Sequence, residues 1–275
     1  MAHPLRYNVI LFLLCLAVGG CSRGAIKKGG AEISGTMSPG DRQEAQRLIS
    51  GLDAENRAAA ASISARFHID GVMNRKKLKI MGTAAYDRKS GKMHIAVVDY
   101  IFRSPLMTVF RDGDTVRFYY PVEKKIFIDS FSNIDLRRYS NLDIPFESVY
   151  SLLTGSIPVI PDYSIRKCLA RGSSGGSYLI LENDEYYETI FFKKNLPGKL
   201  LLVKKSDRSR YEFHLDKRMR ENGSVYYRKM TMISEKDNVR LVLVFDSVAL
   251  NRPVSVRTID SVKTGPDVEL INVAR

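Results

Sequence analysis

Short apolar runs separated by turn signals fill the chain from about residue 63 to residue 249, and this pattern constrains the fold most strongly. We count about a dozen such runs, each bounded by residues that favour turns. Asp112-Gly113, between two of them, is the strongest hairpin signal in the chain. Because strands joined by such short turns are antiparallel, the sequence predicts one large antiparallel sheet.

The expected strands follow one another closely, with one irregular interruption between residues 130 and 176. They cover residues 63–69, 77–86, 93–102, 108–111, 115–120, 125–129, 178–182, 188–193, 199–204, 208–215, 225–233 and 239–249. A further apolar stretch covers residues 268–273. Several strands are apolar on both faces, which predicts a sheet that curls round a helix or a cavity; a filled core and a ligand cavity both stay open.

Two helices accompany the predicted sheet. Residues 38–52 carry apolar side chains at helical spacing, with Ser38 as the expected N-cap. Inside the interruption, one helical face is formed by Phe146, Val149, Tyr150 and Leu153, and Gly155 is placed to end that helix. The fold class is therefore mainly β with α.

The amino-terminal segment has the layout of a secretory signal. Arg6 precedes an apolar run, residues 9–18, that is too short to span a bilayer, and Cys21 follows directly on two glycines. The stretch looks like a bacterial lipobox, although a secreted protein cut beside a cysteine is the alternative. We therefore expect a signal peptide at residues 1–20, lipidation of Cys21, a flexible tether at residues 21–39 and one domain at residues 40–275.

The charge balance indicates which kind of partner the chain meets. The chain has 43 Lys and Arg against 30 Asp and Glu, a formal charge of +13. Such a surplus indicates a polyanionic partner, and for a tethered envelope protein this favours anionic lipid head groups over nucleic acid. A generally basic surface without a specific partner is the alternative. Cys168 has no cysteine partner in the mature chain, so we expect a buried, hydrophobic thiol.

Residues 102–121, together with this arrangement of strands and helices, resemble the LolA/LolB superfamily of bacterial lipoprotein sorting. The resemblance covers most of residues 48–250. It implies an unclosed antiparallel β-barrel of about eleven strands that holds acyl chains under a helical lid. In that case Phe146, Val149, Tyr150 and Leu153 belong to the lid or the cavity, since residues 144–155 are similar to the central helical segment of the family.

Two branches of the superfamily have partial counterparts in the chain. Ser104-Pro105-Leu106 resembles the Pro-Leu-Gly loop of the outer-membrane receptor, with Leu106 at the protruding leucine and Met107 at the glycine. The lipid anchor also favours the receptor. Asp112-Gly113 followed by Tyr119-Tyr120-Pro121 resembles the soluble carrier instead.

An exposed tip at Leu106 and Met107 would make contact with the membrane, with Arg103 and Arg111 near lipid phosphates. The alternative is a tip folded back on its own sheet, because single exposed leucines need no special explanation.

No constellation for catalysis or metal binding stands out. His68, His94 and His214 each lie alone on a strand pattern, without metal-ligand spacing. The carboxylates between residues 182 and 188 are interpreted as a solvated acidic tip around a turn. The sequence predicts no enzyme, no metal and no cofactor.

The lipobox and the family resemblance together imply an outer-membrane lipoprotein that faces the periplasm. Its expected partners are acyl chains of lipoproteins or lipids, the outer membrane through its anchor, and a LolA-like periplasmic carrier, without nucleic acid. A structural or assembly lipoprotein that binds another envelope protein, and a carrier of another hydrophobic molecule, are the alternatives.

Overall fold

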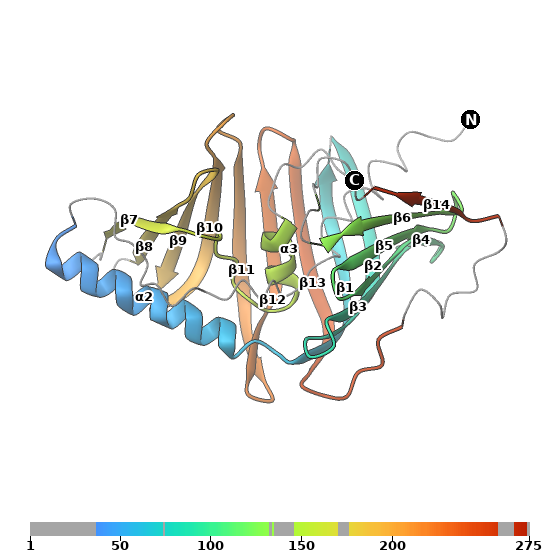
Figure 1. Ribbon diagram of the computed structural model, residues 1–275, viewed down its shortest axis with the longest axis horizontal. Coiled ribbons are helices and arrows are strands. Elements are labelled where there is room, and N and C mark those ends of the chain that lie inside the picture. Colours follow the sequence, from blue (N-terminus) through green and yellow to red (C-terminus); the bar gives the residue numbers. More distant parts are fainter. Residues whose placement is uncertain are drawn as a thin grey trace.

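The computed structural model describes residues 37–73, 75–131, 134, 146–169, 176–257 and 267–273. The predicted signal segment, Cys21 and most of the tether lie outside these residues. Within them, no helix is both long enough and apolar enough to cross a membrane. The described residues form a curved sheet with two helices on one side (Figure 1).

Fourteen strands form one open sheet in the order β14-β6-β5-β4-β3-β2-β1-β13-β12-β11-β10-β9-β8-β7. Their bounds are β1 Ser62–Met73, β2 Lys76–Asp87, β3 Lys92–Asp99, β4 Pro105–Asp112, β5 Thr115–Tyr120, β6 Lys125–Ser130, β7 Ser164–Leu169, β8 Ser177–Glu182, β9 Tyr186–Lys193, β10 Leu196–Lys204, β11 Arg210–Glu221, β12 Ser224–Ser234, β13 Val239–Leu250 and β14 Glu269–Asn272. The first and last strands of this order do not pair, so the unclosed, mainly β sheet expected from the sequence is confirmed.

The edge strand β14 differs from the expectation of a purely antiparallel sheet. It pairs with β6 in parallel, with Leu270 opposite Ile126. Strand β14 follows β13 in the sequence but lies at the edge of the sheet next to β6, not beside β13. The fourteen strands are the twelve predicted runs, β7, which was not predicted, and β14, which forms in the further apolar stretch at residues 268–273. The resemblance implied about eleven.

The two helices form where the apolar spacing predicts them. Helix α2, Pro39–Arg57, begins after Ser38, whose side chain accepts a hydrogen bond from the Asp41 N–H, and it continues one turn beyond the predicted end. Helix α3, Phe146–Leu153, is followed by Gly155 in the left-handed region with φ 75°. Figure 1 shows α3 in front of β12 and β13, and α2 across the half of the sheet that holds β7 to β11.

The hydrophobic core lies between the sheet and these helices. Alternation along β1 directs Phe67 and Ile69 to this side, which we call the covered face, while Arg66 and His68 point to the opposite, outer face. Helix α2 contributes Ala45, Leu48 and Leu52 to the same core.

The turn between β3 and β4 corrects the expected membrane-contact tip. Strand β3 ends at Asp99, whose Oδ1 accepts hydrogen bonds from the N–H groups of Ile101 and Phe102, and β4 already begins at Pro105. Leu106 and Met107 therefore lie inside β4, Leu106 half-buried and Met107 0% exposed on the covered face. The expectation of an exposed Met107 is wrong, because the side chain of Asp99 ends the strand before the apolar run ends.

Candidate functional site

An apolar hollow lies beneath α3, where the family resemblance places acyl chains. It is lined by Leu152, Leu153, Phe213, Met230, Thr231, Met232, Leu241 and Leu243. Its accessible volume is about 30 Å³, which is room for about one water molecule. The hollow lies where the resemblance implies an acyl site, but its volume is too small for an acyl chain.

Aromatic contacts hold the middle of α3 against the sheet. The Tyr150 ring meets the rings of Tyr86 and Phe131 edge-on, with centroids 5.7 and 6.0 Å apart. Arg111 lies over Phe131, 4.0 Å from the ring centroid, and is buried there with its Nε donating to the Gly113 carbonyl. Arg111 therefore does not reach lipid phosphates at the surface, as the sequence had suggested, but supports the covered face.

The chain that leaves α3 crosses the covered face as a short strap, residues 157–161. The Asn56 side chain of α2 makes two hydrogen bonds to the backbone of Ile157. It donates to the Ile157 carbonyl (3.0 Å) and accepts from the Ile157 N–H (2.7 Å). At the other end, the Asn183 side chain donates to the Pro161 carbonyl at 3.0 Å. The strap thus links α3 to both α2 and the β8–β9 turn.

Between these two contacts, the strap rests on a buried carboxyl group. Glu188 of β9 is 2% exposed, and its Oε2 accepts a hydrogen bond from the Ile160 N–H at 2.9 Å. Burial raises the pKa of Glu188 from 4.5 to about 8, while the hydrogen bond from Ile160 lowers it only in part. The Glu188 side chain is therefore mostly protonated at neutral pH, and its interpretation as part of a solvated acidic tip is wrong.

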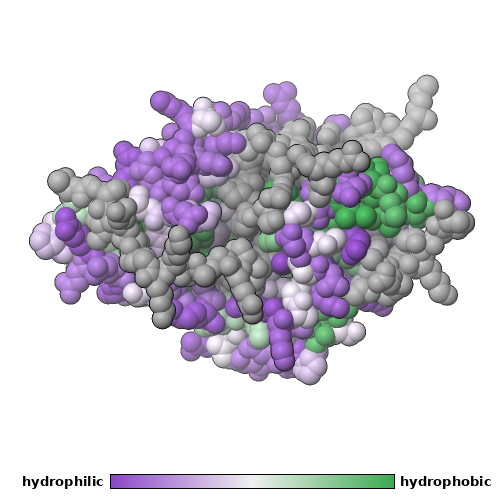
Figure 2. Space-filling view, in the orientation of Figure 1, coloured by the Kyte–Doolittle hydropathy of each residue, from purple (hydrophilic) through white to green (hydrophobic). Residues whose placement is uncertain are grey.

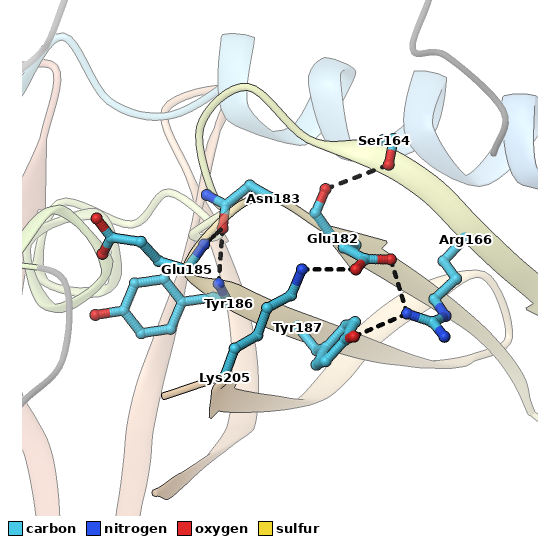
Figure 3. A network of polar contacts seen from close by, with 8 residues as sticks. All are labelled: Ser164, Arg166, Glu182, Asn183, Glu185, Tyr186, Tyr187 and Lys205. Carbon is cyan, nitrogen blue, oxygen red and sulfur yellow. Dashed lines mark hydrogen bonds and ion pairs between the residues drawn. The ribbon is translucent and has the colours of Figure 1, made fainter. Parts of the chain in front are cut away.

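The other charged groups near this turn form a surface network (Figure 3). Glu182 accepts from Arg166 Nη1 at 2.9 Å and from Lys205 Nζ at 2.6 Å, and Arg166 also donates to the Tyr187 hydroxyl. Both cations lie over the Tyr187 ring. This network ties β7, β8, β9 and β10 together beside the end of the strap.

The remaining reactive side chains are bound to neighbours or buried. Cys168 is 2% exposed, and burial raises the pKa of its thiol to about 11, which confirms a hydrophobic role. His68 contacts Asp246 at 2.8 Å, and His214 contacts Glu212. His94 packs on Phe110, and burial lowers its pKa. Across the described part of the chain, no group of three or more potential metal ligands comes together.

The structure describes the side chains of two of the four predicted lid residues. Tyr150 is buried in the aromatic contacts, and Leu153 lines the hollow. The side chains of Phe146 and Val149 lie outside the described residues. Sequence reasoning missed Leu152 and the strand residues of the hollow, although their apolar periodicity in β11 to β13 is the signal that points to the covered face.

The fold defines the class of this protein. It is an open, mainly β sheet with one helix, α2, on its covered face and a second, short helix, α3, over an apolar hollow. No protein-family model matches the chain, and no curated protein matches it in sequence. Solved structures share the fold. A DUF1329 family protein from Desulfovibrio piger has a TM-score of 0.56 at 12% identity, covering 77% of this chain and 95% of that one.

A domain from Vibrio parahaemolyticus, named as a putative outer membrane lipoprotein-sorting protein domain, also shares the fold. Its TM-score is 0.56 at 9% identity, and the match covers 78% of this chain and 94% of that domain. A LolA superfamily protein from Nitrosomonas europaea has a TM-score of 0.47 at 10% identity, covering 76% and 94%. The chain thus shares its fold with the DUF1329 family protein and with the Vibrio parahaemolyticus domain. At these identities the similarity shows the fold alone.

Proposed function

We propose that this protein is an outer-membrane lipoprotein that binds acyl chains on the covered face, beneath α3, and takes part in lipoprotein or lipid movement through the cell envelope. The observation that carries the proposal is the apolar hollow between α3 and β11 to β13. Burial supplies about 0.8 kcal/mol per CH₂ group, so a chain needs few polar contacts. A receptor role of the LolB kind, with a periplasmic carrier as donor, is the specific form proposed.

The size of the hollow requires movement before an acyl chain can enter. A volume of about 30 Å³ does not hold even a short chain, so α3 has to move away from β12 and β13 on binding. The small volume of the hollow favours the second candidate function, a structural or assembly lipoprotein that binds another envelope protein. Ligand occupancy distinguishes the two functions.

Filling the hollow tests the acyl site. We expect Met230→Trp to weaken binding of a fluorescent fatty acid about tenfold, because the larger ring takes space equivalent to about two CH₂ groups. Met219→Trp, the same change at a 39% exposed position on β11, is the matched control. Equal affinity in all three proteins would show that the acyl chain does not bind in the hollow. The absence of any co-purifying acyl chain in native mass spectrometry would favour the assembly function.

The anchor has its own prediction. Cys21→Ala is expected to remove the lipid, so that cell fractionation finds the protein in the soluble periplasmic fraction and mass spectrometry finds no diacylglyceryl or acyl adduct. Cys168→Ala, a change at the buried thiol, is the control that should keep the lipid. An unmodified Cys21 in the wild-type protein from cells would contradict the lipoprotein assignment.

A further inference from the structure

Exposed apolar side chains gather at one end of the sheet. Among the described residues, eight large hydrophobic side chains are exposed, and six of them lie at the end where the β1–β2, β3–β4 and β5–β6 turns and the start of β14 come together. These six are Val72, Tyr100, Ile101, Phe102, Val122 and Leu270. Figure 2 shows hydrophobic residues gathered on the side of the molecule where Figure 1 places β6 and β14.

The β3–β4 turn holds its apolar side chains outward on an ordered backbone. Ile101 is 76% and Phe102 81% exposed, although their N–H groups are both bound by Asp99. Two further backbone bonds close the turn, from Arg103 N–H to the Asp99 carbonyl and from Asp99 N–H to the Ser104 carbonyl. Because the backbone of the turn is already ordered, a partner that buries these side chains loses little affinity to ordering it.

Cations surround these apolar side chains. Arg75, Lys76 and Lys77 are exposed at the β1–β2 turn, and Arg103 is exposed beside Phe102. None of these four forms an ion pair within the described part of the chain. Lys79 and Arg103 lie over the Tyr100 ring, at 4.1 and 5.6 Å from its centroid.

The acidic groups at this end are largely engaged. Asp267 pairs with Lys124 at 2.9 Å and Glu269 with Lys125 at 3.5 Å, so these charges offset one another. Burial raises the pKa of Glu123, and the positive charge of Lys125 opposes that shift. The free charge of this end is therefore positive.

We propose that this end, here called the rim, docks on an anionic lipid surface, with Ile101, Phe102, Val122 and Leu270 among the acyl chains and Arg75, Lys76 and Lys77 at the head groups. Apolar tips between unpaired cations match an anionic bilayer interface, which is apolar within and negative at its surface. The tether permits this, because the residues between Cys21 and Ser38 span up to about 55 Å when extended. Four separate chain segments build the surface, so it is wider than one protruding loop.

A tryptophan reporter tests the rim, since the chain contains no tryptophan of its own. The full chain carrying Phe102→Trp is mixed with vesicles of phosphatidylcholine alone or with added phosphatidylglycerol, both with brominated acyl chains. We expect the fluorescence of the introduced indole to shift to the blue and to be quenched in the anionic vesicles. Leu196→Trp, at a 38% exposed position at the opposite end of the sheet, is the control that should stay unquenched.

The charge requirement has a separate test in the Phe102→Trp background. Lys76→Gln with Lys77→Gln is expected to lower the ratio of inserted to free reporter about 30-fold on anionic vesicles at low salt. Lys193→Gln with Lys194→Gln removes two exposed lysines at the opposite end and should leave the ratio unchanged.

Three results would overturn the proposal. They are no quenching of the Phe102→Trp reporter in either vesicle, equal quenching in neutral and anionic vesicles, and a blue shift of the reporter fluorescence with another protein but not with vesicles. The inference is independent of the acyl site beneath α3. Fatty-acid binding is measured without vesicles, so failure of one proposal leaves the other standing.

Discussion

Replacing Glu188 with Gln is expected to remove most of a steep loss of stability between pH 5 and pH 8. The Glu188 carboxyl is buried on the covered face, where its pKa is raised to about 8 by burial. An unfolded chain ionises the same group near its ordinary value of 4.5. Between these values the folded state binds a proton that the unfolded state has released.

The sign of the effect follows from this difference. The contribution of Glu188 is fully present below pH 4.5 and is lost as the pH rises through 8, at about 1.4 kcal/mol per pH unit within that window. Gln keeps an oxygen that accepts the Ile160 N–H but carries no charge, so the variant is expected to equal the wild type at low pH and exceed it at pH 8 by several kcal/mol.

Urea unfolding of both proteins at a series of pH values measures this difference. Glu185→Gln removes an exposed carboxyl from the neighbouring turn and controls for the change in net charge. Parallel stability curves for wild type and Glu188→Gln would show that Glu188 is ionised or solvated in the folded protein, and that the strap is not held as described.

Gly71→Ala is the second change with a large expected effect, a loss of about 3 kcal/mol of unfolding free energy. A Cβ at Gly71 would lie 2.2 Å from the Arg240 carbonyl oxygen and 2.9 Å from the Leu241 Cα. Both neighbours belong to β13, which pairs with β1 at the centre of the sheet. The backbones of β1 and β13 have to move apart, and this displaces Leu241 at the hollow beneath α3.

Gly51→Ala in α2 is the matched control, because nothing lies within 4 Å of a Cβ at that position. There the same change should stabilise the protein by about 0.5 to 1 kcal/mol, since alanine loses less entropy than glycine in a helix. Thermal unfolding followed by circular dichroism reports both variants. A neutral Gly71→Ala would mean that β1 and β13 approach each other less closely than described.

Local patterns predicted most of the elements. Alternating apolar residues and turn signals act over a few neighbours, so the strands from β1 to β6 and from β8 to β13 are recognisable in the sequence. The helical spacing of Tyr150 and Leu153 and the glycine at 155 likewise predicted α3. Strand β7 and the parallel pairing of β14 were missed, because they depend on which edge of the sheet is free.

The sequence did not predict the direction of side chains at places where a single residue changes the conformation of a turn or where a charged residue is buried. Asp99 ends β3 early, which moves Met107 into the core and turns Ile101 and Phe102 outward. Glu188 lies two residues beyond the start of β9, and strand alternation sends it to the face opposite Tyr187. Composition shows neither result, and because β9 carries apolar residues on both faces, its alternation alone does not say which face is buried.

The sequence by itself determined the class of fold and its amphipathic faces, because hydrophobic periodicity and turn chemistry are local properties of the chain. Only the tertiary structure decided how small the hollow beneath α3 is, that a buried carboxyl supports the strap, and that four distant turns and edges meet in one basic, apolar rim. These features arise where segments far apart in sequence pack together, and packing depends on the shape of both partners at once.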